Sequence, residues 1–71
     1  DGGEDGLKFY KKIIEQACNY IENGYLILEI GYDQKEDVEN LLKENKNYSE
    51  IKTIQDLSGN DRCVIAKVGK I

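Results

Sequence analysis

The first third of the chain carries apolar residues at the spacing of one helical face. They recur every three or four positions, at Tyr10, Ile13, Ile14, Ala17, Cys18 and Ile21. The residues between them are polar: Lys11, Lys12, Glu15, Gln16 and Asn19. Asp5 is placed to cap the first free N–H groups, and Asn23-Gly24 tolerates the left-handed backbone that ends a helix. The pattern therefore predicts a helix that begins near Gly6 or Leu7 and continues until Asn23-Gly24 stops it.

A strand is predicted next, at residues 25–30, where a nearly continuous apolar run ends at Gly31. Such a run is typical of a strand in a parallel sheet that helices cover on both faces. We therefore expect this strand to be buried on both sides. Asp33 and Glu36 stand three positions apart, like the two ends of a capping box with Asp33 as the cap. They predict a second helix from about Gln34 to Asn45, which buries Val38, Leu41 and Leu42.

The last third of the chain is typical of an antiparallel hairpin. Residues 48–55 alternate imperfectly between apolar and polar, and residues 62–68 form the clearest β-branched run. The turn-forming residues 58–61 separate them. The connection between residues 30 and 49 is long enough for a helical crossover, so the first two strands can be parallel. The sequence thus predicts an α/β fold in the order helix, strand, helix, strand, strand.

Composition excludes several function classes. The 71 residues include 14 acidic and 10 basic side chains, a net charge of -4, and no His, Pro, Met or Trp. Without His, this chain has no Ser-His-Asp triad and no His-containing zinc site. The negative charge disfavours nucleic acid as a direct partner, and no apolar run is long enough to span a membrane. Because the sequence begins with Asp1 and lacks Met, we expect a fragment or a processed product.

Few side chains indicate chemistry. Glu29 falls near the carboxyl end of a predicted strand, where open α/β sheets place their ligand crevice, and a buried charge there needs a partner. The simpler interpretation is a supporting carboxylate with hydrogen-bond donors around it. Cys18 and Cys63 are too few for a disulfide framework, which favours a reducing cytoplasm, and we interpret both as buried apolar residues. Arg62 is expected to pair with an aspartate of its own hairpin.

Three blocks of the sequence carry a family resemblance. Residues 1–7, 28–34 and 56–62 resemble, in order and in spacing, the C-terminal end of the HemK/PrmC family. These are S-adenosylmethionine-dependent methyltransferases that modify the glutamine of the Gly-Gly-Gln loop in peptide chain release factors. The resemblance implies that residues 1–71 form one partial domain, the C-terminal part of a Rossmann-like class I methyltransferase sheet. It also implies that the last strand is antiparallel and inserted between the other two.

The resemblance carries over no catalytic or cofactor-binding residue. The family holds S-adenosylmethionine with a glycine-rich loop and the substrate glutamine with an Asn-Pro-Pro-Tyr motif, and this sequence contains neither. It implies only substrate-proximal positions, at Asp1, Gly2, Gly3, Glu29 and Gln34. We expect no metal site, because the EF-hand-like start Asp1, Asp5, Gly6 fails at the later ligand position of Lys12. We therefore expect a part of a cytoplasmic enzyme that is inactive alone and self-associates through residues 25–30. The alternative is a free-standing α+β interaction module that pairs through an exposed strand edge.

Overall fold

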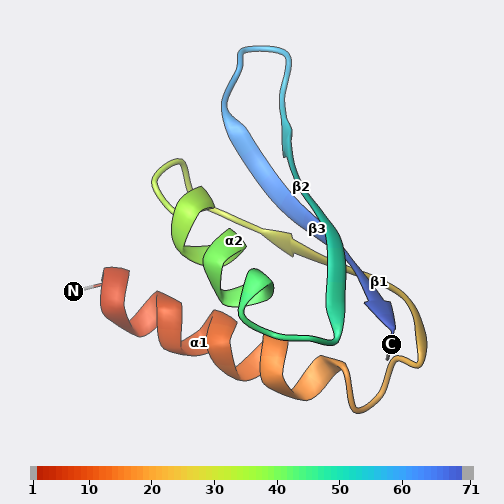
Figure 1. The fold of residues 1–71 in the computed structure, drawn as a ribbon. Coiled ribbons are helices and arrows are strands. Elements are labelled where there is room, and N and C mark those ends of the chain that lie inside the picture. Colours follow the sequence, from red (N-terminus) through yellow and green to blue (C-terminus); the bar gives the residue numbers. More distant parts are fainter. Residues whose placement is uncertain (1, 70–71) are drawn as a thin grey trace.

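The computed structural model of the protein describes residues 2–69, with side chains from residue 6 onward. Two helices and three strands follow in the predicted order: α1 (Gly2–Ala17), β1 (Asn23–Glu29), α2 (Lys35–Lys43), β2 (Tyr48–Gln55) and β3 (Asp61–Gly69). The two helices contact each other on one side of the sheet, and the β2–β3 hairpin projects beyond them (Figure 1). Among the described residues, no helix has the length and apolar character needed to cross a membrane.

The three strands form one antiparallel sheet in the order β1-β3-β2. β3 pairs with β1 on one side, with Leu28 opposite Val64, and with β2 on the other, with Tyr48 opposite Val68. The implied insertion of the last strand between the other two is therefore confirmed. Because β1 and β2 are both antiparallel to β3, they run in the same direction, as expected.

The core lies between the helices and the facing side of the sheet. It contains Ile14 from α1, Val38 and Leu42 from α2, Tyr48 from β2, and Leu28, Ile30, Val64, Ala66 and Val68 from the region of β1 and β3. Tyr10, Ile13, Cys18, Ile21 and Leu41 pack against it while partly exposed. Both predicted apolar helix faces are therefore confirmed, since the 3.6-residue period brings those side chains to one side.

The predicted ends of the first helix are wrong. α1 begins at Gly2, so Asp5 lies inside the helix and does not cap it. α1 ends at Ala17 because the backbone tightens there, with Asn19 N–H donating to Gln16 O at 2.9 Å and Tyr20 N–H to Ala17 O at 3.0 Å. Such bonds to the third preceding residue are common where an α-helix ends. The helix therefore stops well before Asn23.

The predicted capping box of the second helix is also wrong. α2 begins at Lys35, its N-cap is Gln34, and no side chain caps it. The Gln34 side chain instead turns back to accept a hydrogen bond from Gly31 N–H. The helix still lies within the predicted range of residues 34–45.

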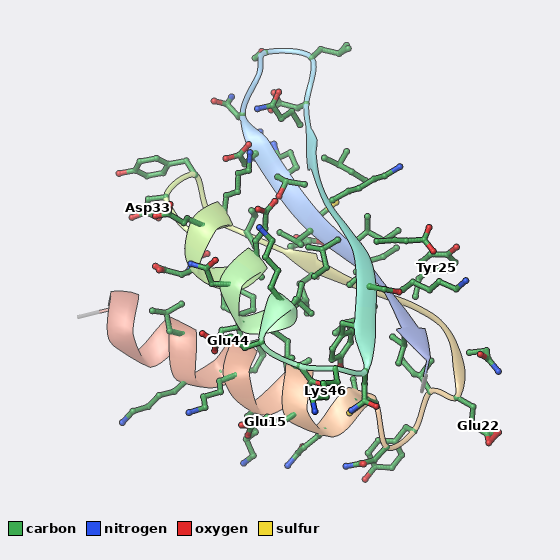
Figure 2. The ribbon with its side chains drawn as sticks, viewed as in Figure 1. Glu15, Glu22, Tyr25, Asp33, Glu44 and Lys46 are labelled. Atoms are coloured by element: carbon green, nitrogen blue, oxygen red, sulfur yellow. The ribbon has the colours of Figure 1, made fainter. Side chains whose placement is uncertain are left out.

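β1 differs from the expectation of a strand buried on both faces. Leu26 and Leu28 face the core, whereas Tyr25 is 58% exposed and Ile27 59% exposed on the opposite face. Figure 2 shows Tyr25 pointing away from the helices. Both helices pack against the same side of the sheet, so no described residue covers the other side. The two later strands match their predicted ranges, with β3 one residue longer at each end.

Candidate functional site

The carboxyl end of β1 carries a small polar network, to which α1 and the entry of α2 contribute. The Gln34 side-chain oxygen Oε1 accepts a hydrogen bond from Gly31 N–H at 2.6 Å. The Tyr10 hydroxyl, which comes from α1, donates to the backbone oxygen of Glu29 at 2.6 Å and lies 3.3 Å from Gln34 Oε1. Three segments that are distant in sequence thus meet at the end of one strand.

Two glycines allow Gln34 to approach this closely. A Cβ atom at Gly31 would lie 3.2 Å from Gln34 Oε1, and one at Gly6 would lie 3.3 Å from Gln34 Nε2. Both distances are shorter than ordinary van der Waals contact, so a larger residue at either position would push the amide away. Gly6 therefore places the first half of α1 against the loop that follows β1.

Burial raises the pKa of the Tyr10 hydroxyl, and the negative charge of Glu29 raises it further. Tyr10 therefore stays neutral at physiological pH and remains a hydrogen-bond donor. The Glu29 side chain is exposed, and its carboxylate accepts no hydrogen bond from a described residue. The expectation of a rim carboxylate held by surrounding hydrogen-bond donors is therefore wrong for the described residues.

The structure brings two of the predicted substrate-proximal residues together. Glu29 and Gln34 both contact the Tyr10 hydroxyl, Glu29 through its backbone oxygen and Gln34 through its side chain. Gly2 and Gly3 lie in the first turn of α1, about one turn before Gly6. Asp1 lies outside the described residues. Sequence reasoning missed Tyr10, because its position in the apolar face of the helix already explained why a large side chain is there. Its hydroxyl group was the only hint that it could also form hydrogen bonds in this network.

The β2–β3 turn forms a second polar cluster. Asp56 accepts hydrogen bonds from the backbone N–H groups of Asn60 and Ser58, each at 2.9 Å, and Arg62 Nε lies 2.9 Å from its carboxylate. The Asn60 N–H, together with the Arg62 side chain, lowers the pKa of Asp56. Arg62 therefore pairs within its own hairpin, as predicted. Gly59 has a φ of 86°, which the turn requires and which glycine adopts without strain.

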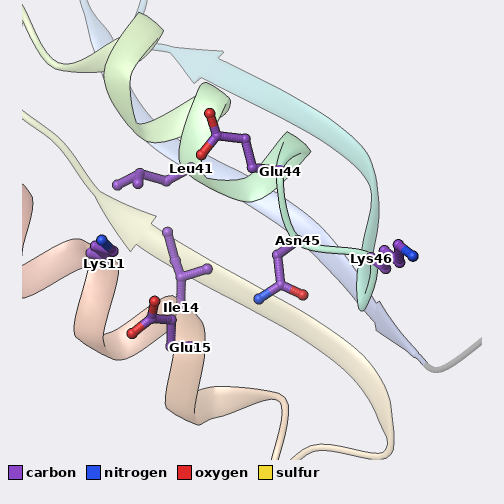
Figure 3. A pocket seen from close by; sticks show the side chains of 7 residues that line it. All are labelled: Lys11, Ile14, Glu15, Leu41, Glu44, Asn45 and Lys46. Atoms are coloured by element: carbon purple, nitrogen blue, oxygen red, sulfur yellow. The ribbon is translucent and has the colours of Figure 1, made fainter.

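The remaining candidates offer little chemistry. Cys18 and Cys63 are free and only partly buried, and no group of three metal-ligating side chains occurs within the described part of the chain. A hollow of about 420 Å³ lies between the helices (Figure 3). It is lined by Lys11, Ile14, Glu15, Leu41, Glu44, Asn45 and Lys46. Its lysines and glutamates balance, so its charge selects neither anions nor cations.

Curated release factor glutamine methyltransferases are similar to almost the whole chain. The protein from Fusobacterium nucleatum is 47% identical over 64 residues, which cover 89% of this chain and 18% of that protein. The one from Thermodesulfovibrio yellowstonii is 42% identical over 71 residues, 99% of this chain and 25% of that protein. The chain belongs to the release factor glutamine methyltransferase family. The resemblance seen in the three sequence blocks is thus confirmed.

The chain spans about a fifth to a quarter of the length of the curated relatives it matches. A further relative, from Bacillus anthracis, is 37% identical over 68 residues, 94% of this chain and 24% of that protein. No protein-family model matches the chain, and no solved structure is significantly similar to it.

Proposed function

We propose that this chain is the C-terminal portion of a cytoplasmic release factor glutamine methyltransferase, in which residues 1–71 complete a Rossmann-like sheet. In the whole enzyme, a methyl group passes from S-adenosylmethionine to the side-chain amide of the glutamine in the Gly-Gly-Gln loop of a release factor. The observation that carries the proposal is the unequal coverage of the two aligned proteins. Almost the whole chain aligns with a methyltransferase, yet it accounts for only a quarter of it.

The open side of the sheet supports this assignment. Ile27 and Tyr25 on β1 and Ile54 on β2 expose apolar side chains on the face that the helices leave free, at 59%, 58% and 47%. A domain that was complete at 71 residues would gain free energy by covering them, at roughly 25 cal/mol per Å² of apolar surface. These side chains are therefore suited to packing against other parts of a larger protein.

The reacting groups belong to other parts of the proposed enzyme. An amide nitrogen is a weak nucleophile because its lone pair is delocalised, so the reaction depends on positioned hydrogen-bond partners. S-adenosylmethionine supplies the electrophilic methyl group. The residues present do not fit that cofactor: the sequence has no G-x-G-x-x-G loop, and Gln34 already occupies the N–H of Gly31 at the end of β1. We therefore propose a structural role for the chain and no catalytic residue within it.

A chimera tests the proposal. Residues 1–71 replace the aligned segment of the Thermodesulfovibrio yellowstonii protein, and the product is assayed for methyl transfer to a release factor. We expect the chimera to be active, whereas the same protein without this segment should be inactive. The isolated chain should give no heat of S-adenosylmethionine binding in calorimetry. A monodisperse, folded chimera without activity, or micromolar stoichiometric cofactor binding by the isolated chain, would contradict the proposal.

We also propose that Asp1, Gly2, Gly3, Glu29 and Gln34 lie near the substrate in the whole enzyme; of these, Glu29 and Gln34 lie at the carboxyl end of β1. Because the exposed carboxylate of Glu29 is bonded to no described residue, we expect it to contribute little to catalysis. Glu29→Gln in the full-length enzyme should lower kcat/KM by less than tenfold, about 1.4 kcal/mol. Replacing the asparagine of the Asn-Pro-Pro-Tyr motif should abolish turnover in the same steady-state assay. Equal losses in the two variants would make Glu29 a direct substrate contact.

The second candidate is a free-standing interaction module, which the open edge of β1 favours. The two candidate functions predict different sequences in the reading frame upstream of Asp1. An Asn-Pro-Pro-Tyr motif within a few tens of residues upstream supports the enzyme, whereas a start codon in its place supports the module.

A further inference from the structure

Apolar packing holds the end of α1 more firmly than its beginning. Among the side chains of α1 that the structure describes, which start at residue 6, Ile14 is the only one in the buried core. Leu7 and Tyr10, which precede it, are only partly buried. Because Ile14 lies near the end of the helix, the first two turns need another contact to fix their place against the sheet.

The Tyr10 hydroxyl provides that contact. It donates to Glu29 O at 2.6 Å and lies 3.3 Å from Gln34 Oε1. These partners are 19 and 24 positions away in the sequence, so one side chain joins α1 both to the end of β1 and to the entry of α2. A hydrogen bond is directional, whereas apolar contact is not. The hydroxyl therefore determines how the beginning of α1 approaches the strand end.

Gln34 completes the contact from the other side. Its Oε1 accepts a hydrogen bond from Gly31 N–H at 2.6 Å, and its Nε2 lies so close to α1 that a Cβ atom at Gly6 would be 3.3 Å away. One amide group thus touches both the helix and the loop that follows β1. Loss of either the Tyr10 hydroxyl or the Gln34 amide would loosen the same junction.

The positions proposed to lie near the substrate stand on both sides of this junction. Gly2 and Gly3 are at the beginning of α1, and Glu29 and Gln34 are at the end of β1. At about 1.5 Å of rise per residue, Gly2 is about 18 Å from Ile14, so a tilt of about 5° about Ile14 would move it by about 1.5 Å. Displacements of about 1 Å are large enough to impair an enzyme.

We propose that Tyr10 is a positioning residue for the protein substrate. Through Glu29 O and Gln34, its hydroxyl holds the two sides of the junction together, so that Gly2, Gly3 and residues 29–34 present one surface to the release factor. This proposal rests on the proposed function. Every contact that it uses joins residues 6–34 to one another, so it does not depend on which other part of the enzyme packs against the sheet.

The proposal predicts a change in KM rather than in kcat. The reacting groups are proposed to lie elsewhere in the enzyme, so this surface binds the release factor equally before and during methyl transfer. A substitution that removes such uniform binding raises KM and leaves kcat unchanged. S-adenosylmethionine binds away from these residues, so its KM should not change.

Steady-state kinetics of Tyr10→Phe in the full-length enzyme test the proposal. Phenylalanine keeps the ring and its edge contact with Phe9, and it removes only the hydroxyl. We expect the KM for the release factor to rise by about threefold to tenfold, the factor that corresponds to the net contribution of one hydrogen bond. The kcat and the KM for S-adenosylmethionine should stay at their wild-type values.

Tyr48→Phe is the matched control. It removes a hydroxyl that donates to Ile14 O at 2.6 Å, which is a hydrogen bond to the same helix far from its beginning. A variant that is only less stable contains less folded enzyme, and this lowers the apparent kcat without changing KM. We therefore expect Tyr48→Phe to lose stability and to keep the wild-type KM for the release factor.

A double variant tests the route through Gln34. Residues of one hydrogen-bond network do not act independently, so Tyr10→Phe should raise the KM for the release factor less in a Gln34→Ala background than in the wild type. An equal rise in both backgrounds, no rise in Tyr10→Phe, or an equal rise in Tyr48→Phe would overturn the positioning role and leave the proposed function standing. A folded wild-type enzyme that does not methylate a release factor would overturn both.

Discussion

Tyr48 joins the sheet to the first helix through one buried hydrogen bond. It is the first residue of β2 and is 6% exposed, and its hydroxyl donates to the backbone oxygen of Ile14 at 2.6 Å. Ile14 is itself a core residue near the end of α1. Tyr48→Phe keeps the ring and its packing and removes only the donor. The variant therefore isolates the contribution of this hydrogen bond.

The expected loss of unfolding free energy is about 1–3 kcal/mol, because the Ile14 oxygen keeps its buried position and loses one donor. A chain of 71 residues has a total stability of only about 4–11 kcal/mol at ~0.05–0.15 kcal/mol per residue. One hydroxyl therefore accounts for a large share of the total. For a domain of this size the melting temperature should fall by about 4–8 °C per kcal/mol.

Urea unfolding followed by circular dichroism, at pH 7 and at a protein concentration that keeps the chain monomeric, measures this loss. Tyr20→Phe is the matched control, because it removes a hydroxyl from a ring that is 86% exposed. The control should change stability by less than about 0.5 kcal/mol. If Tyr48→Phe is no more destabilised than the control, then the hydroxyl does not hold β2 to α1.

Alkaline pH gives a second measurement. Burial, with a smaller effect of Cys18, raises the pKa of Tyr48 from 10.0 to about 12. The unfolded chain then releases its proton first, so stability falls as the pH rises. The contribution of the hydroxyl is complete below pH 10 and lost as the pH passes through about 12. The stability difference between the wild type and Tyr48→Phe should narrow over that interval and stay constant below it.

Two further substitutions test the polar networks at the strand ends. Gln34→Ala removes the acceptor of the exposed Gly31 N–H and should cost about 0.5–1.5 kcal/mol in urea unfolding, whereas Gln34→Glu, which keeps an acceptor, should cost less. Asp56→Asn should destabilise the chain at neutral pH, because the Asn60 N–H and the Arg62 side chain favour the ionised carboxylate and lower its pKa. This contribution to stability is present above the ordinary aspartate pKa and is lost as the pH falls through the lowered pKa of Asp56. In urea unfolding, the stabilities of the wild type and Asp56→Asn should therefore converge in acid. A stability difference that stays constant across that pH range would contradict this expectation.

The elements that the sequence predicted well are those whose pattern reports burial directly. The helical stripe led to Ile14, the second helix to Val38 and Leu42, and the β-branched run to Val64. Each of these side chains faces the core, so its spacing matches the element that presents it. The position of β3 between its neighbours came from the family resemblance, because strand order depends on contacts between distant segments that a local pattern does not contain.

The features that the sequence did not predict depend on tertiary contacts. Asp33 has the residue type of a cap, yet Gln34 occupies that position because its side chain binds Gly31 and lies beside Tyr10. The role of Tyr10 was hidden for the same reason, since its hydroxyl acts on a residue 19 positions away. The most informative wrong prediction is that β1 is buried on both faces, because its outer face is apolar and exposed. A run such as 25–30 predicts cover on both sides, and the described chain provides cover on one.

The strand at the end of the chain also determines the geometry at the candidate site. Among the described residues, β1 and β2 bond to β3 and not to each other, so the sheet requires residues 61–69 before it can form. β3 pairs with β1 up to Glu29, and Arg62 O then holds the Ile30 N–H. This last bond orients the outward carbonyl of Glu29 toward Tyr10, and Arg62 is in turn held by Asp56 in the hairpin turn. The network at the end of β1 is therefore assembled by the hairpin, although none of its own side chains comes from β2 or β3.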